Sequence, residues 1–212
     1  MTALAFSPDA DRLASAYCLE TESGAGQPPA CLSSKVLLWD VSTGAKIAEF
    51  QPEQAGFIQA LAFQNSGPLL ALSRDDHTIN VWNLQTLAQD GVELALPAGV
   101  NASSLAFSDD DSMLASGNSD KSLLLWDANT HQPIGRPMFG APDTLLSLAY
   151  DRSTGDLFAG GTDGAVQKWF AAPAGWIPPN CIIAGRNMTQ TEWEQFFPGE
   201  PYRLTCPDFP PG

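Results

Sequence analysis

Four tryptophans recur along the chain at an almost constant interval, and this spacing constrains the fold more than any other feature. They stand at Trp39, Trp82, Trp126 and Trp169, so the steps are 43, 44 and 43 residues. A Leu-Ala-aromatic triplet precedes each tryptophan, by 19 residues in the last three units and by 33 in the first. A period of this length predicts a repeat architecture, with 14 residues inserted into the first repeat.

Each repeat consists of short strand-like segments separated by turns rich in Asp, Asn, Ser and Gly. In the third repeat we predict strands at 102–107, 113–116 and 123–126, and in the second at 58–63, 69–73 and 78–82. A fourth, less regular strand fits before each following repeat, at 46–50, 92–96 and 133–138. Four strands in about 43 residues predict the blade of a β-propeller.

The repeats resemble those of the WD-repeat (β-transducin-type) propeller family. The resemblance rests on Trp39-Asp40, Trp126-Asp127, the degenerate Trp82-Asn83 and the turn aspartates Asp76, Asp120 and Asp163. It covers about residues 1–170 and implies an all-β fold: a β-propeller of four WD-type blades, as an incomplete or half ring, with a short α-helical C-terminal tail. We assign residues 1–172 to the blades, with an insertion at 18–34, and residues 173–212 to the tail.

In this family the turn aspartate often joins a histidine from the preceding loop in a buried network. The corresponding loops at 55–57, 98–100 and 142–144 contain no histidine. The resemblance therefore implies that this network is lost and that the blades rest on packing. We expect the triplet aromatics and the pairs 70–71, 114–115 and 158–159 to face neighbouring blades. We expect the turn aspartates to accept backbone N–H bonds.

Four blades are too few for the closed ring that hides strand edges in most propellers. Met1 stands at the start of an innermost strand. We favour the interpretation that the chain is the C-terminal part of a larger propeller, truncated at its start. The alternative is a homodimer in which two chains complete a ring of eight blades.

Two cysteine pairs bracket special segments. Cys18 and Cys31 flank the polar, Gly/Pro-rich insertion, which we predict to be a loop on one face of the disc. A disulfide between them is one interpretation, and two unrelated thiols is the one that we favour without a secretory context. Cys181 and Cys206 bracket the tail, and the sequence leaves open whether they pair or are simply buried.

The tail carries a helix signal. Thr189 and Glu192 form a capping-box pattern that predicts a helix over 191–197, and Gly185 predicts the end of a preceding helical turn. The segments 181–193 and 201–207 resemble a tail that ends many bacterial WD-repeat proteins. In that group the propeller often follows a signalling ATPase, kinase or caspase-like domain, which implies a bacterial origin and a sensor or interaction role.

Charge and composition argue against several classes of function. The net charge of −14 is spread evenly, which disfavours nucleic-acid binding. No apolar run is long enough for a membrane span and no signal peptide is readable, so we predict a cytoplasmic protein. The two histidines stand on separate loops and no nucleophile or nucleotide motif appears, so we predict no cofactor, no metal site and no catalysis.

These features predict a non-enzymatic scaffold or sensor module that binds a protein partner through loops on one face of the propeller. The candidate binding residues are Phe57, Arg74, Asn101 and Asn118, which lie at strand entries or turns of that face. Two other functions remain open: self-assembly of half-propellers into a dimer, and an enzyme with its active site in the central channel.

Overall fold

The structure is a computed structural model that describes residues 2–22, 30–52, 56–171, 181–196, 199 and 201–210. Its strands form four antiparallel sheets, one for each tryptophan repeat. Sheet one contains β1 (Ala3–Phe6), β2 (Arg12–Glu22), β3 (Ala30–Asp40) and β4 (Lys46–Phe50). Sheet two contains β5 (Ile58–Phe63), β6 (Leu69–Arg74), β7 (Thr78–Asn83), β8 (Ala88–Gln89) and β9 (Leu94–Ala95).

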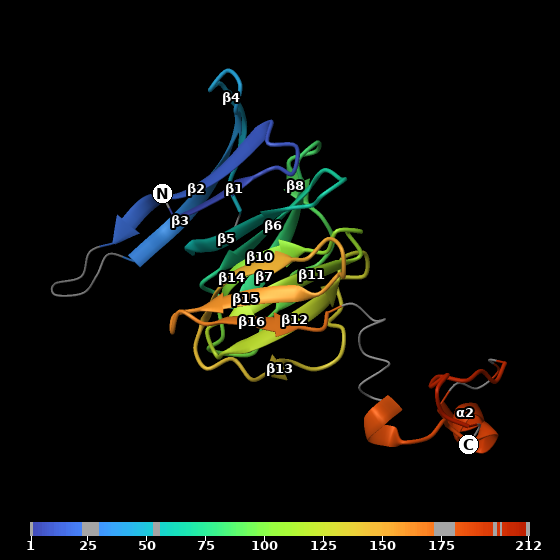
Figure 1. Cartoon of the computed structure of the whole chain (residues 1–212). Coiled ribbons are helices and arrows are strands. Elements are labelled where there is room, and N and C mark those ends of the chain that lie inside the picture. Colours follow the sequence, from blue (N-terminus) through green and yellow to red (C-terminus); the bar gives the residue numbers. More distant parts are fainter. Residues whose placement is uncertain are drawn as a thin grey trace.

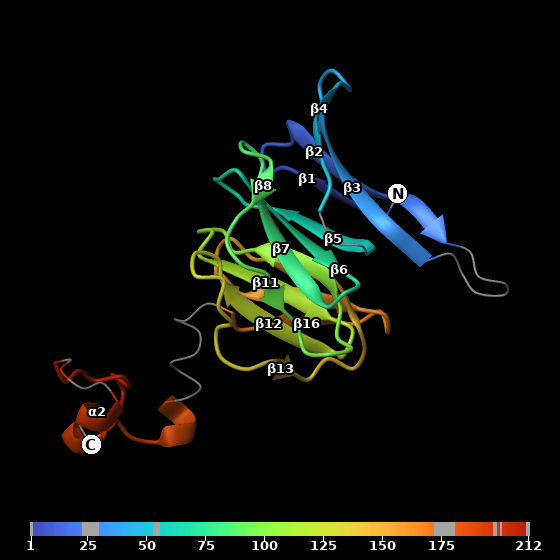
Figure 2. The same ribbon diagram turned by 180° about the vertical axis from the view of Figure 1, so that it is seen from behind.

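Sheet three contains β10 (Ala102–Phe107), β11 (Met113–Asn118), β12 (Ser122–Asp127) and β13 (Met138–Phe139). Sheet four contains β14 (Leu145–Tyr150), β15 (Leu157–Gly161) and β16 (Val166–Trp169). In each sheet successive strands are neighbours, as expected when tight turns join them. Figures 1 and 2 show the sheets following one another along the molecule, with the tail beside them. Each sheet is hereafter called a blade.

The inner three strands of blades two and three agree with the sequence prediction to within two residues. The outermost strand of blade one, β4, matches the expected 46–50, whereas those of blades two and three differ from the expectation. In blade two the expected strand at 92–96 is reduced to β9, and the separate strand β8 precedes it. In blade three only Met138 of the expected 133–138 belongs to a strand, and Pro133 makes an isolated bridge to Trp126. Proline at 133 and 137 explains this, since it donates no ladder hydrogen bond.

The core is divided into three apolar clusters, and each cluster lies between two neighbouring blades. Phe63 and Trp82 of blade two pack toward blade one, while Phe107 and Trp126 of blade three pack toward blade two. The expectation that the triplet aromatics face between blades is thus confirmed for these blades. Phe6 is 61% exposed because, among the described residues, no sheet packs on its side of blade one.

The residue pairs 70–71, 114–115 and 158–159 of the second strands are buried between blades, as expected, except at Phe158. Ala71 and Ala115 are fully buried, and Ala159 is 1% exposed. Phe158 of β15 is 38% exposed, because it points to the free side of blade four while Leu157 points to blade three. Blades one and four therefore each present one apolar face that no other part of the described chain covers.

The insertion in the first repeat is not all loop, which corrects the prediction. β2 and β3 extend into it as a long hairpin, in which Cys18 pairs with Ser34 and Glu22 with Ala30. Its Gly/Pro-rich centre, residues 23–29, lies outside the described residues. The favoured interpretation of unrelated thiols is also wrong: Cys18 and Cys31 form a disulfide, since the hairpin brings their Cα atoms to 5.7 Å.

The tail folds as a short, cross-linked unit. A helical turn at 181–184 ends at Gly185, and α2 (Gln190–Phe196) follows. Thr189 and Glu192 exchange the hydrogen bonds of a capping box, which confirms that prediction. A disulfide joins Cys181 to Cys206. The residues between the last blade and this unit, 172–180, lie outside the described part of the chain.

Candidate binding face

The four predicted binding residues lie at one edge of blades two and three. Phe57 and Asn101 immediately precede β5 and β10, and Arg74 and Asn118 end β6 and β11. Ile58 pairs with Arg74, and Ala102 pairs with Asn118, so the structure brings the four residues together as two equivalent pairs. We call this side the entry edge. It consists of the segments 56–57, 100–101 and 143–144 and the turns 75–77, 119–121 and 162–165.

Two of the four residues are buried. Arg74 is 1% exposed, and its Nη2 lies 2.8 Å from an oxygen of Asp76. Asn118 is 0% exposed and donates from Nδ2 to the Ser122 hydroxyl. Both side chains hold the turn that follows their strand, so they shape the entry edge from beneath.

The other two residues are half-buried and reach the surface. The backbone N–H of Phe57 donates to Asp75 at 2.7 Å, which fixes the start of β5. The side-chain oxygen of Asn101 lies 2.7 Å from Nδ1 of His77, across the junction between blades two and three. Of the four, Phe57 and Asn101 are therefore the side chains available to a partner. That they contact one stays a prediction.

The turn aspartates accept backbone N–H bonds, as we expect from their position in the turns. Asp76 accepts from Thr78, Asp120 accepts from Ser122, and Asp163 accepts from the Ala165 N–H. These short Asx-type bonds hold the turns between the second and third strands.

The expectation that the blades rest on packing alone needs correction. His77 reaches forward to the Val100 carbonyl at 3.1 Å, so a histidine from a turn links the blades although the loop histidine of the family is absent. Three serine hydroxyls also donate to carbonyls of the next blade: Ser34 to Gly56, Ser73 to Ala102 and Ser104 to Leu145. Each junction thus has a hydrogen bond whose partners only the tertiary structure brings together.

The entry edge is acidic. Its aspartates are Asp75, Asp76, Asp120, Asp143 and Asp163. The Thr162 hydroxyl, followed by the Thr144 N–H, holds the pKa of Asp143 below its ordinary value. Lys121 donates to the Pro142 carbonyl, and Arg74 is buried against Asp76. A partner surface with basic side chains matches this distribution of charge.

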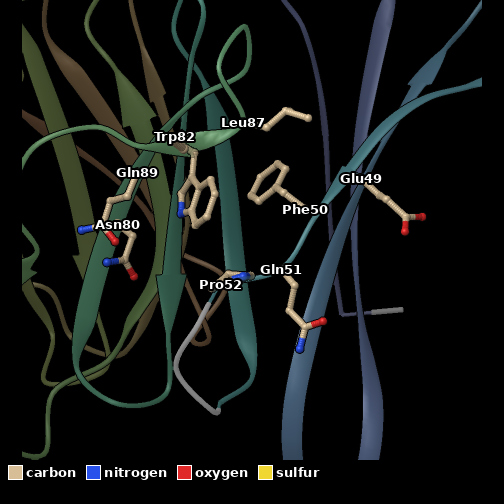
Figure 3. Close-up of a pocket in the computed structure, with 9 residues that line it drawn as sticks. Glu49, Phe50, Gln51, Pro52, Asn80, Trp82, Leu87 and Gln89 are labelled. Atoms are coloured by element: carbon tan, nitrogen blue, oxygen red, sulfur yellow. The ribbon is translucent and has the colours of Figure 1, made fainter.

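A pocket that the sequence reasoning missed lies between the outer strands of blades one and two. It has a volume of about 590 Å³ and is lined from β4 and the residues after it by Glu49, Phe50, Gln51 and Pro52, and from blade two by Asn80, Trp82, Leu87, Ala88 and Gln89. Figure 3 shows the rings of Phe50 and Trp82 side by side in its lining; they are stacked, with their centroids 4.5 Å apart. The available signal was Asn80, a polar residue in an otherwise apolar strand two positions before the tryptophan.

The described residues contain no group of three or more His, Cys, Asp or Glu side chains placed to hold a metal ion. None of the helices within the described ranges is long and apolar enough to cross a membrane.

Comparison with known families identifies the repeat type. Residues 44–83 and 97–127 match the model of the WD domain, G-beta repeat. These two segments are WD40 repeats. The first match begins just before β4, the outer strand of blade one, and ends with β7 of blade two. The first match is therefore offset from the blade and includes strands of two neighbouring blades, whereas the second contains β10, β11 and β12 of blade three.

Curated relatives share the repeats at modest identity. The chain is 27% identical to human Striatin-3 over 155 residues, which is 60% of this chain and 18% of that protein. It is 33% identical to the Periodic tryptophan protein 2 homolog of Schizosaccharomyces pombe over 112 residues, or 51% and 12% of the two chains. It is 27% identical to the Anaphase-promoting complex subunit cdc20 of Dictyostelium discoideum over 139 residues, or 65% and 27%.

Solved structures confirm the fold class. The crystal structure of RRP9 WD40 repeats superimposes with a TM-score of 0.63 at 20% identity, covering 82% of this chain and 48% of that one. The structure of U3-55K gives 0.61 at 19% identity, with 82% and 49% covered. The fold is thus a WD40-type β-propeller of four blades with an open ring. The chain spans about half the length of these structures and less than a third of each curated relative named above.

Proposed function

We propose that the chain is a non-enzymatic scaffold that binds a protein partner at the entry edge. The observation that carries the proposal is the pair of WD40 repeats in blades two and three, whose entry edge presents Phe57 and Asn101 within a rim of aspartates. A half-buried aromatic residue surrounded by charge is typical of an interaction surface. The charge favours a partner with a basic surface.

We also propose that further blades complete the ring around these four. Support comes from the two free faces, where the chain exposes large apolar side chains: Leu4 and Phe6 of blade one, and Leu146, Phe158 and Val166 of blade four. Apolar faces of this kind mark surfaces that are covered in the functional state. A second copy of the chain is the alternative cover.

The complete protein would then be a bacterial signalling protein, as the resemblance of the tail implies. The tail segments 181–193 and 201–207 support this assignment. The cytoplasmic location stays a prediction of the sequence. The two disulfides argue against the cytoplasm, because cystines persist mainly in oxidising compartments. The location is tested by alkylating the protein inside its native cells and measuring the redox state of its four cysteines by mass spectrometry. Reduced cysteines would support a cytoplasmic location, and two intact disulfides would overturn it.

The partner site is tested by crosslinking and affinity capture from the organism that encodes the chain. The double variant F57A/N101A should reduce recovery of the partner by about tenfold or more, since few central residues carry most binding energy. Asp109→Asn on the opposite edge is the control, because Asp109 is exposed and forms a surface ion pair with Arg152, away from the entry edge. Equal recovery with F57A/N101A and wild type would show that the entry edge is not the binding surface.

The covering of the free faces is tested by light scattering. A particle of twice 22.6 kDa supports ring completion by two copies, against the proposal. A monomer, or concentration-dependent association without a defined size, supports further blades. The variant F6S/F158S tests whether any association uses the free faces, because it should remove either form of association without touching the entry edge.

A further inference from the structure

The pocket between blades one and two exists because the outer strand of blade two is broken. β8 pairs with Trp82 and Asn83, whereas β9 pairs with Thr78 and Ile79. Between them the chain turns away at Gly91, whose φ is +68°. A Cβ atom at Gly91 would lie 2.0 Å from the ring of His131, so the buried histidine of blade three occupies the space beside it. Asn80 therefore faces an opening in the outer strand of its own blade.

The side chain of Asn80 is buried without a hydrogen-bond partner. Asn80 is 1% exposed, and among the described residues neither its Nδ2 nor its Oδ1 has a partner. Gln89 lies on the same side of the pocket but makes no hydrogen bond to it that would satisfy either atom (Figure 3). Buried polar atoms are nearly always paired, so a primary amide with both ends unpaired requires an explanation.

The indole of Trp82 provides a second unpaired group at the same place. In blades one and three the tryptophan Nε1 donates to a serine of the second strand, Trp39 to Ser15 and Trp126 to Ser116. The equivalent residue in blade two is Leu72, because Leu70 pairs with Trp82 as Leu114 pairs with Trp126. Trp82 Nε1 therefore has no acceptor within the described part of the chain.

The next groove along the propeller shows that the repeat does not require these polar groups. A cavity of about 320 Å³ lies between blades two and three, lined by apolar residues that include Leu124 and Trp126. Leu124 occupies the position equivalent to Asn80, and Trp126 is satisfied by Ser116. This groove therefore lacks the unpaired polar groups of the pocket between blades one and two.

In blade four, Gln167 and Trp169 stand at the positions equivalent to Asn80 and Trp82, and among the described residues Gln167 Oε1 and Trp169 Nε1 are also unpaired. Gln167 Nε2 donates to the Gly140 carbonyl, so of these two amides only that of Asn80 has both ends unpaired.

We propose that this pocket binds a planar, uncharged amide group. The side chain of Asn80 offers one donor and one acceptor side by side, which is the complement of a carboxamide, and Trp82 offers a further donor. The stacked rings of Phe50 and Trp82 provide a flat apolar wall for a planar group. The one charged residue in the lining, Glu49, is already bound by Lys35 and Lys46, so no free charge would balance an ionic ligand.

The amide is supplied either by an Asn or Gln side chain of a partner or by a free small molecule. The proposal does not rest on the entry edge, because the pocket is lined by the outer strands and the probes below are small molecules. Its failure therefore leaves the proposed scaffold role intact.

The test is a titration of the full 212-residue chain with benzamide, followed through the indole N–H resonances of the tryptophans. Benzamide should shift the resonance of Trp82, which is assigned by its disappearance in Trp82→Phe. Benzoate has the same shape but is charged and lacks the donor, so it should leave that resonance in place. Asn80→Leu, which copies Leu124, should weaken benzamide binding by about tenfold or more, because two hydrogen bonds are lost.

Controls keep the result interpretable. Asn80→Leu should melt no lower than wild type, since it removes unpaired buried polar atoms, so a loss of binding would not reflect unfolding. Gln89→Ala removes an exposed amide at the rim and should change binding by less than about twofold. Tighter binding of N-acetyl-glutamine methylamide than of benzamide would indicate a protein side chain as the natural source, and the reverse a free ligand. The proposal is overturned if both probes leave Trp82 unmoved, or if Asn80→Leu binds benzamide as wild type does.

Discussion

The blades and the tail of this chain are stabilised in different ways. Each middle blade is held by apolar clusters on both of its faces, and every cluster is shared with a neighbouring blade. The tail, by contrast, has one large buried apolar side chain among its described residues, Trp193, and is otherwise held by a disulfide, a capping box and a buried asparagine. A segment as short as 181–210 cannot bury enough apolar surface to fold on that alone, so covalent and polar links take the place of a core.

Asn187 is the centre of the tail. It is 1% exposed, and its Nδ2 lies within hydrogen-bond distance of the carbonyls of Cys206, Phe209 and Pro210. Its Oδ1 accepts from the N–H of Cys206 at 2.8 Å. One side chain thus satisfies several backbone groups of the extended C-terminal segment. Among the described residues, the hydrogen bonds of the tail join only residues 181–210, so we expect blades and tail to unfold separately.

The largest effect should come from a cavity in the blades. Leu114 is 1% exposed in the cluster between blades two and three, and Leu114→Ala should lower the free energy of unfolding by about 2–5 kcal/mol. Hydrogen exchange measured by mass spectrometry should show lost protection across residues 58–127 and unchanged protection in α2. Equal loss of protection in the tail would show that the two regions form one cooperative unit.

Removal of the tail disulfide should lower protection against hydrogen exchange in the tail and leave it unchanged in the blades. The double variant C181S/C206S opens a cross-link between residues 25 positions apart and should destabilise the tail by about 2–4 kcal/mol. Exchange should rise in 181–210 and stay constant in the blades. The matched control is C18S/C31S, which removes the other disulfide and should affect only the hairpin of β2 and β3. A tail as well protected in C181S/C206S as in wild type would contradict the comparison.

Asn187→Ala tests whether the hydrogen bonds of Asn187 contribute to the stability of the tail, as its disulfide is expected to do. The substitution leaves the Cys206 N–H buried without its acceptor and should cost about 1–3 kcal/mol, again confined to the tail. The exchange rate of the Cys206 amide reports this directly. If that amide stays as protected as in wild type, another group holds the C-terminal segment.

Ser116→Ala sharpens the comparison within the blades, because it makes blade three resemble blade two. Trp126 Nε1 would lose its acceptor, at a cost of about 1 kcal/mol. Denaturant titration measures the loss, and the indole N–H of Trp126 should exchange faster. The same substitution at Ser15 is the control for a tryptophan that is only half-buried, where water can replace the serine and the effect should be smaller.

The smallest effect should be a pH dependence of the tail. The Arg186 side chain, followed by the Thr189 N–H, lowers the pKa of Glu192 from 4.5 to about 2. Because the pKa is lower in the folded state, the stabilisation is complete above pH 4.5 and is lost as the pH falls toward about 2. NMR of α2 should show it fraying over this range, and Glu192→Gln should remove the pH dependence. A helix that stays intact down to pH 2 would contradict the assignment.

The sequence predicted the inner strands well because their signal is local and repeated. The Leu-Ala-aromatic triplet, the Asx turn and the tryptophan recur at fixed distances, so strand positions in blades two and three follow from the period alone. The capping box of Thr189 and Glu192 is equally local and was predicted correctly. The outer strand of blade one was predicted correctly, at 46–50. Those of blades two and three were predicted poorly: in blade two the course depends on Gly91 and His131, which come from different blades, and in blade three on the prolines at 133 and 137.

The sequence by itself thus determined the repeat, the blade and the helix start, because each is encoded by residues within a few positions of one another. Only the tertiary structure decided which cysteines meet and which of the four candidate residues are buried. It also decided that the side-chain amide of Asn80 and the Nε1 of Trp82 have no hydrogen-bond partner among the described residues. The physical reason is the same in each case. Burial and hydrogen bonding depend on what the neighbouring strand or blade places opposite a side chain, and that neighbour lies tens of residues away along the chain.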